Sequence, residues 1–215
     1  MADIAPLFES NRAWAMSKLK ADPGFFGRLA EQQTPAYLWI GCADSRVPAN
    51  EIVGLDPGEL FVHRNVANLV HPADMNCLAV LQYAIEFLKV KHVIVTGHYG
   101  CGGVRAAMLP QQLGLIDHWL RPIREVHAKN EDELLQVVDE YKRLNLLCEM
   151  NVREQVSNLA KTTIVQNAWH RGQDLSLHGW VYGISNGLIR DLGVTISGVD
   201  TLGRVFQTEP VQPAP

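Results

Sequence analysis

The sequence has few cysteines, no cluster of basic residues and no long apolar run, and each absence narrows its class. Four cysteines spread over 215 residues are too sparse for the disulfide frameworks of small secreted domains. No apolar stretch approaches the ~20 residues that cross a bilayer, and the first residues lack the basic and then apolar pattern of a signal peptide. We therefore expect a cytoplasmic protein with reduced thiols and no membrane partner.

The charge balance argues against a nucleic-acid partner. The formal net charge is -4, and no run of lysine or arginine forms a basic patch. Hydrophobic residues make up 47% and charged residues 20%, as in ordinary globular chains. Without a repeat or linker, we expect one domain over 1–215, with a helical arm over about 1–32, a core over about 33–205 and a disordered or extended tail over about 206–215.

Five short apolar segments have the composition of strands and alternate with helical patterns. The predicted strands are 36–40, 59–63, 90–96, 177–184 and 188–194. A Ser-Asn-Gly turn joins the last two, which indicates a hairpin, although 188–191 is also compatible with a helix. Near-continuous apolar strands between helices predict an α/β fold with a mostly parallel central sheet, an antiparallel edge and flanking helices.

Apolar residues at helical spacing predict the helices. They cover 7–19, 72–88, 103–108 and most of 116–170, with mild breaks near Pro122 and Asn130. Asp22-Pro23 predicts a further helix start, with proline in the first helical position.

Residues able to bind metal follow two of the predicted strands. Cys42 and Asp44 come after the first strand, in GCADSRVP, and His98 and Cys101 come after the third, in GHYGCGG. Because ligands bind outside the carboxyl ends of parallel strands, we expect these side chains to converge on one ion. Thiolate and imidazole suit zinc. Water in the fourth position would give a catalytic site, and Asp44 there would close it.

Arg46 competes with the metal for Asp44. An Asp–Arg pair keeps the carboxylate ionised and points it away from the metal. The glycines of GHYGCGG allow a tight turn and close backbone approach, and the next helix directs free amides toward the site. Each of the two motifs alone is a weak signal of a metal site, because C-x-D and H-x-x-C occur by chance and a single cysteine is commonly a small buried hydrophobe.

With these motifs the sequence resembles the β-class carbonic anhydrases. CADSR, HRNVAN and GHYGCGG carry the resemblance, which is closest over 33–104. It implies reversible hydration of CO2 to bicarbonate and a proton, with Asp44 and Arg46 as a catalytic dyad. The zinc ligands that it implies are Cys42, His98 and Cys101.

The resemblance also implies a substrate pocket and an assembly. The family pocket spans a dimer interface, so a homodimer is expected, often paired into a homotetramer. The matching pocket residues are Gln33, Phe61, Val66, Tyr83 and Gly102.

One subgroup of the family, type II, is regulated by bicarbonate bound at a second site. Its marker residues correspond here to Trp39, Arg64 and Tyr182. The resemblance therefore implies that bicarbonate favours a closed state, in which Asp44 leaves Arg46 and binds zinc.

Two other functions share these motifs. A hydrolase of CS2 or COS would use the same metal chemistry, and a purely structural zinc site would keep Asp44 as its fourth ligand, although Arg46 argues against it. A thiol redox role is disfavoured because Cys42 and Cys101 do not form C-x-x-C. Cys77 and Cys148 lie on apolar helix faces and are expected in the core. Histidines without ligand spacing are expected at the surface or in local bonds: His63, His71, His92, His118, His127, His170 and His178.

Overall fold

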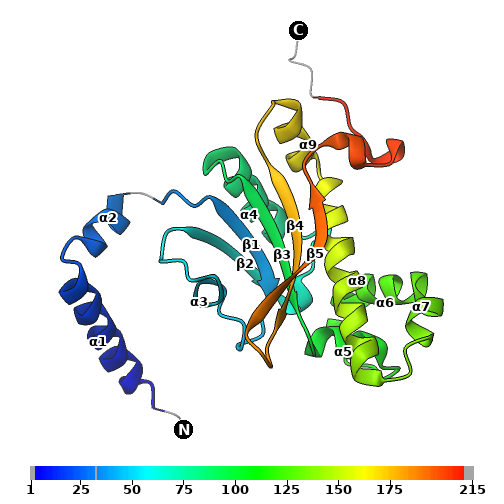
Figure 1. Cartoon of the computed structure of the whole chain (residues 1–215), viewed down its shortest axis with the longest axis horizontal. Helices are drawn as coiled ribbons and strands as arrows, with labels where there is room; N and C mark the ends of the chain where they lie inside the picture. Colours follow the sequence, from blue (N-terminus) through cyan, green and yellow to red (C-terminus); the bar gives the residue numbers. More distant parts are fainter. Residues whose placement is uncertain (1–2, 32, 211–215) are drawn as a thin grey trace. The chain divides into compact units, whose positions relative to one another are not determined.

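The computed structural model describes residues 3–31 and 33–210 and divides into two compact units, Met1–Thr34 and Pro35–Pro215 (Figure 1). The N-terminal unit holds α1 (Ala5–Ala21) and α2 (Phe25–Glu31). The predicted helix start at Asp22-Pro23 is wrong by two residues. Asp22 has an extended backbone and its carboxylate accepts the Gly24 N–H at 3.0 Å, so the chain turns before α2 begins.

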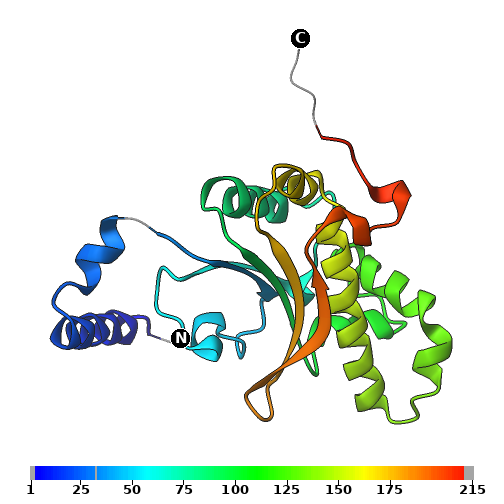
Figure 2. The same cartoon turned by 45° about the horizontal axis from the view of Figure 1, so that its top comes forward.

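The second unit is built on a five-stranded sheet in the order β2-β1-β3-β4-β5 (Figures 1 and 2). Its strands are β1 (Tyr37–Cys42), β2 (Leu60–Asn65), β3 (His92–His98), β4 (Ser176–Gly183) and β5 (Leu188–Ile196). The first four strands in the order are parallel neighbours, and β5 runs antiparallel to β4. The predicted fold class is confirmed, and the segment 188–191 is strand.

Helices cover both faces of this sheet. The helices are α3 (Ala49–Val53), α4 (Met75–Gln82), α5 (Gly102–Met108), α6 (Ile116–Lys129), α7 (Glu131–Leu135), α8 (Glu140–Ala160) and α9 (Thr163–His170), with a π-helical turn at Tyr83–Phe87 and 3-10 turns at Val66–Asn68, Val199–Thr201 and Arg204–Phe206. One face of the sheet packs Leu38 and Val95 against Val152 and Val156 of α8. The other packs Trp39 and Leu60 against the start of α3.

The segment predicted as largely continuous helix, 116–170, forms four helices. The predicted break near Asn130 is present, where the Asn130 side chain donates to the Val126 carbonyl at 2.7 Å. Asp139 and Thr162 begin α8 and α9 by accepting backbone N–H groups. Pro122 lies inside α6 and does not end it.

The described part of the C-terminal segment lies against α9. The side chain of Gln166 donates to the Phe206 carbonyl at 2.9 Å and accepts the Thr208 N–H at 2.7 Å. The predicted tail therefore has an extended, bonded start, and 211–215 lie outside the described residues. Over 3–31 and 33–210, no helix has the length and apolar character needed to cross a bilayer.

Candidate metal centre

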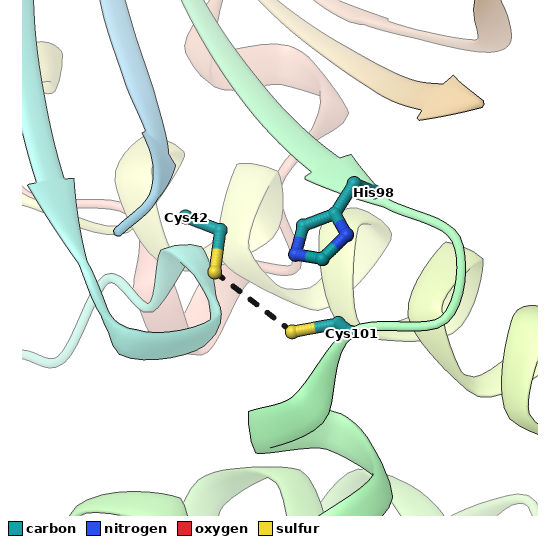
Figure 3. Close-up of side chains that lie close together, drawn as sticks. All are labelled: Cys42, His98 and Cys101. Atoms are coloured by element: carbon teal, nitrogen blue, oxygen red, sulfur yellow. Dashed lines mark hydrogen bonds between the residues drawn. The ribbon is translucent and has the colours of Figure 1, made fainter. Parts of the chain in front are cut away.

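Three ligand side chains meet at the carboxyl ends of β1 and β3 (Figure 3). Cys42 and His98 are the last residues of these adjacent parallel strands, and Cys101 directly precedes α5. One ligand atom from each lies within 4.8 Å of the others. The two Sγ atoms are 3.9 Å apart. The predicted convergence of these three residues is thus present in the fold.

The donor atoms fit zinc. His98 Nδ1 lies 3.1 Å from the Tyr99 carbonyl, so Nδ1 carries the proton and Nε2 keeps its lone pair. Nε2 is buried and has no hydrogen-bond partner among the described residues, which is costly unless another group binds it. Two sulfur atoms and one imidazole nitrogen form a common zinc donor set.

The contact between the two thiols shifts their pKa values in opposite directions. A hydrogen bond from the Cys101 thiol lowers the pKa of Cys42, burial raises it, and the backbone N–H groups of Asp44 and Ala67 lower it further. The same thiol bond, followed by burial, raises the pKa of Cys101. A divalent cation favours the second deprotonation, because metal binding releases protons from thiol ligands.

Asp44 is held by Arg46 at the edge of this group. Arg46 Nε and Nη2 donate to the carboxylate at 2.9 and 2.7 Å, and the Arg46 backbone N–H donates at 3.0 Å. These bonds hold the pKa of Asp44 well below its usual range. Asp44 Oδ2 is also 3.7 Å from His98 Nε2. The carboxylate is therefore ionised and stands beside the ligand set.

Arg64 binds the backbone of the same loop. Its Nε donates to the Cys42 carbonyl at 2.9 Å and its Nη2 to the Asp44 carbonyl at 2.5 Å. From α8, the Asn145 side chain accepts the Gly100 N–H at 3.0 Å. Sequence reasoning missed both contacts, because they join segments whose proximity depends on the strand register and on the course of α8.

Known proteins match this chain over most of its length. A protein-family model described as carbonic anhydrase matches residues 37–189. A carbonic anhydrase of Emericella nidulans is 50% identical over 193 residues, covering 90% of this chain and 85% of that relative. The chain belongs to the β-class carbonic anhydrase family. The expectation that it is an enzyme of this class is confirmed.

Two solved β-carbonic anhydrases have the same fold. The enzyme of Coccomyxa in complex with acetazolamide is 41% identical, with a TM-score of 0.88, and the match covers 93% of this chain and 90% of that one. A tetrameric β-carbonic anhydrase of Sordaria macrospora is 39% identical, with a TM-score of 0.85, and the match covers 89% of this chain and 97% of that one.

In this carbonic anhydrase the predicted pocket residues fall into separate places. Gly102 follows Cys101 directly, and Val66 is 39% exposed and next to α5. Phe61 pairs with the β1 residue four positions before Cys42, about 13 Å away along the strand. The ring of Tyr83 is 5.9 Å from that of Phe61. The remaining pocket residue, Gln33, belongs to the N-terminal unit.

The three residues predicted to bind the effector share one sheet face. Arg64 pairs with Gly41, two residues beyond Trp39 on β1. On β3, Ile94 pairs with Trp39, and His98 lies four residues beyond Ile94 and pairs with Tyr182 of β4. Residues paired across strands, and residues two or four apart along a strand, project to the same side.

A second possible metal group lies in the core of this carbonic anhydrase. Ligand atoms of His63, Asp74 and Cys77 are within 4.8 Å of one another. Asp74 already caps α4 through the Asn76 and Cys77 N–H groups, and His63 Nε2 lies 3.3 Å from the amide nitrogen of Asn65. Burial raises the pKa of Cys77 to about 12, so this thiol is protonated. These residues therefore have structural partners without an ion.

The other predictions for cysteines and histidines are partly confirmed. Cys77 and Cys148 are buried, as expected. His92 is locally bonded, with its Nδ1 3.1 Å from His178 Nε2. His63 is buried, with only 6% of it exposed, and is also locally bonded, with its Nε2 3.3 Å from the side-chain nitrogen of Asn65.

Proposed function

We propose that this enzyme binds zinc through Cys42, His98 and Cys101 and converts CO2 and water reversibly into bicarbonate and a proton. The observation that carries the proposal is the buried lone pair of His98 Nε2, which faces two cysteine thiols and lacks a partner within the described chain. The carbonic anhydrases named above support the choice of reaction.

The residues around the ligands have separate roles in this proposal. Bound zinc supplies Lewis-acid chemistry that makes water a nucleophile near neutral pH. Asp44 would accept a hydrogen bond from the attacking water and so orient its lone pair toward the CO2 carbon, while Arg46 fixes the carboxylate. Val66 offers an apolar surface to CO2, and the Gly102 N–H can donate to a substrate oxygen.

The direct test combines metal content with turnover. We expect one zinc per chain and rapid CO2 hydration, faster at about pH 9 than at about pH 7, because two thiolate ligands donate more charge to zinc than imidazoles do. Protein that contains zinc yet hydrates CO2 no faster than buffer would contradict the proposal. CS2 and COS are the comparison substrates.

The alternative functions have less support. The relatives named above are carbonic anhydrases rather than CS2 or COS hydrolases. A structural site would need Asp44 on the metal, whereas Arg46 holds its carboxylate with three hydrogen bonds. The two reduced thiols are also consistent with the proposed cytoplasmic location.

We also propose a homodimer in which one copy completes the substrate pocket of the other, and in which two dimers can pair into a tetramer. Phe61 and Tyr83 stand too far along the sheet to reach Cys42 of their own chain. Tyr83 stacks on Phe87 at 5.4 Å, and these side chains are 44% and 68% exposed beside the edge strand β2. These exposed aromatic rings therefore offer an apolar surface for contact between the two copies.

Sedimentation velocity tests this assembly. We expect the mass of a dimer or tetramer at concentrations at which the enzyme is active. A fully active monomer would contradict a pocket shared between copies.

Bicarbonate is proposed to act at the face formed by Trp39, Arg64 and Tyr182, where it favours movement of Asp44 onto the metal. Trp39 Nε1 and Thr96 Oγ1 are buried there without hydrogen-bond partners among the described residues. A side chain at Gly41 would collide with the Trp39 indole nitrogen. Arg64 retains N–H donors beyond the two used by backbone carbonyls.

Trp39→Phe is expected to weaken bicarbonate inhibition at pH 7. The substitution removes one donor to the anion, and hydrogen bonds to charged groups contribute about 1.5–3 kcal/mol, so half-inhibition should need about 10- to 100-fold more bicarbonate. Trp180→Phe is the matched control, because the Trp180 ring lies on the same sheet face with its centroid 6.4 Å from that of Trp39. Inhibition is measured relative to the uninhibited rate of each protein. Equal inhibition of the Trp39 variant and the wild type would contradict a bicarbonate site at this face.

A further inference from the structure

Ala67 has an unusual backbone conformation beside the proposed zinc ligands. Its φ is 65° and its ψ is 27°, although it is not glycine, and it is fully buried. L-residues adopt this left-handed conformation only at a cost, so surrounding contacts must hold it. Ala67 lies two residues beyond Asn65, which pairs in register with Cys42.

Ala67 lies beside the ligand sulfurs, because it shares one buried cluster with Cys42 and Cys101. Its backbone N–H, like that of Asp44, lowers the pKa of the Cys42 thiol. Hydrogen bonds to a ligating atom orient it and tune its donation to the metal. The Ala67 methyl group also packs against the start of α5, where a side chain at Gly103 would approach it to 3.1 Å.

A chain of buried amides on α8 holds Ala67 from the other side. Asn151 Nδ2 donates to the Ala67 carbonyl at 3.1 Å, and Gln155 Nε2 donates to Asn151 Oδ1 at 2.9 Å. Gln155 Oε1 accepts the Val70 N–H at 2.9 Å. Both α8 side chains are fully buried. The chain thus ties the segment Ala67–Val70 to α8 through its own peptide groups.

We propose that Asn151 and Gln155 are positioning residues for the metal ligand Cys42: they hold Ala67 in its left-handed conformation and so keep its N–H beside the ligand sulfur. The inference rests on the proposed zinc site. Apolar side chains could fill the same space on α8 without needing partners, so the amides are explained by the peptide groups that they bind.

Asn151→Leu tests the inference through metal binding rather than activity alone. It keeps the approximate volume of the side chain and removes the bond to the Ala67 carbonyl. Partners of ligating residues typically contribute 10–100-fold to metal affinity, so zinc affinity measured by chelator competition should fall about tenfold or more. In the cobalt-substituted protein, the thiolate-to-cobalt charge-transfer band should shift.

Gln166→Leu is the matched control. Gln166 is an equally buried amide, but it bonds the C-terminal segment at Phe206 and Thr208. This variant should lower the Tm without changing zinc affinity or the cobalt spectrum. If Asn151→Leu does not fold, Gln155→Met, which removes the next bond in the chain, is measured in its place with the same expectation.

A second substitution separates positioning from general stability. Glycine adopts positive φ without the penalty that alanine has, so adding Ala67→Gly to Asn151→Leu should restore part of the zinc affinity and move the cobalt band back. Asn151→Leu protein could instead keep the wild-type zinc affinity and cobalt spectrum and show only a lower Tm, as the control does. That result would overturn the inference and leave the zinc proposal standing. Wild-type protein that binds no zinc would overturn both.

Discussion

Cys101→Ala is expected to abolish zinc binding and CO2 hydration together. The substitution leaves two protein ligands, Cys42 and His98, and also removes the thiol hydrogen bond that lowers the pKa of Cys42. Without the metal, water is not activated near neutral pH, so kcat/KM should fall by roughly 10³-fold or more. Metal analysis and stopped-flow CO2 hydration on the same sample measure both effects.

Cys77→Ala is the control for this experiment, because Cys77 is equally buried but lies on the buried face of α4. It should lower the Tm by a few degrees through the lost side-chain volume, with zinc retained. A Cys101→Ala protein that still holds one zinc per chain and hydrates CO2 at the wild-type rate would show that Cys101 is not a ligand.

Asp44→Asn is expected to retain zinc and lose most turnover. Asparagine has nearly the same shape, but its NH2 group cannot accept hydrogen bonds from Arg46 or from water. The dyad therefore loses its fixed acceptor, and positioned acceptors of this kind contribute about 10²–10⁴-fold. kcat for CO2 hydration, measured at equal zinc content, should fall within that range.

Asp22→Asn provides a comparable change elsewhere, since Asp22 is also paired with an arginine, Arg28, in the N-terminal unit. Its turnover should match the wild type. Full turnover of the Asp44 variant would mean that the carboxylate has no part in the reaction.

The lowered pKa of Asp44 also limits its role in the pH profile. Arg46 keeps the carboxylate ionised, and a depressed pKa means that its charge is lost only as the pH falls through that low value. Protonation of Asp44 while it is bound to Arg46 therefore does not cause changes in rate between about pH 6 and 9. Changes in rate over this pH range would instead reflect titration at the metal site or a shift to the bicarbonate-favoured state.

The sheet could be predicted from the sequence because its strands are short, apolar and separated by clear turns. The predicted strand 36–40 is observed as Tyr37–Cys42, and the Ser-Asn-Gly turn marks the antiparallel edge. The helical segment 116–170 was harder to divide, because apolar spacing continues through it. Single capping residues such as Asp139 and Thr162 decide where its helices begin.

The ligand set was accessible from sequence for a physical reason. Cys42 and His98 end adjacent parallel strands, so the predicted parallel sheet already places them at the same edge. The contacts of Arg64 and Asn151 depend on register and on the course of α8, which no local pattern specifies. One signal was present: Asn151 and Gln155 are polar residues four apart on an otherwise apolar helix face.

X-ray absorption at the zinc edge of the purified wild-type enzyme tests the central claim most directly. We expect one zinc per chain with two sulfur neighbours at about 2.3 Å and one imidazole nitrogen at about 2.0–2.1 Å, with an oxygen as the fourth ligand. A zinc shell with no sulfur, or with a single sulfur, would contradict it, because Cys42 and Cys101 could not then both hold the metal.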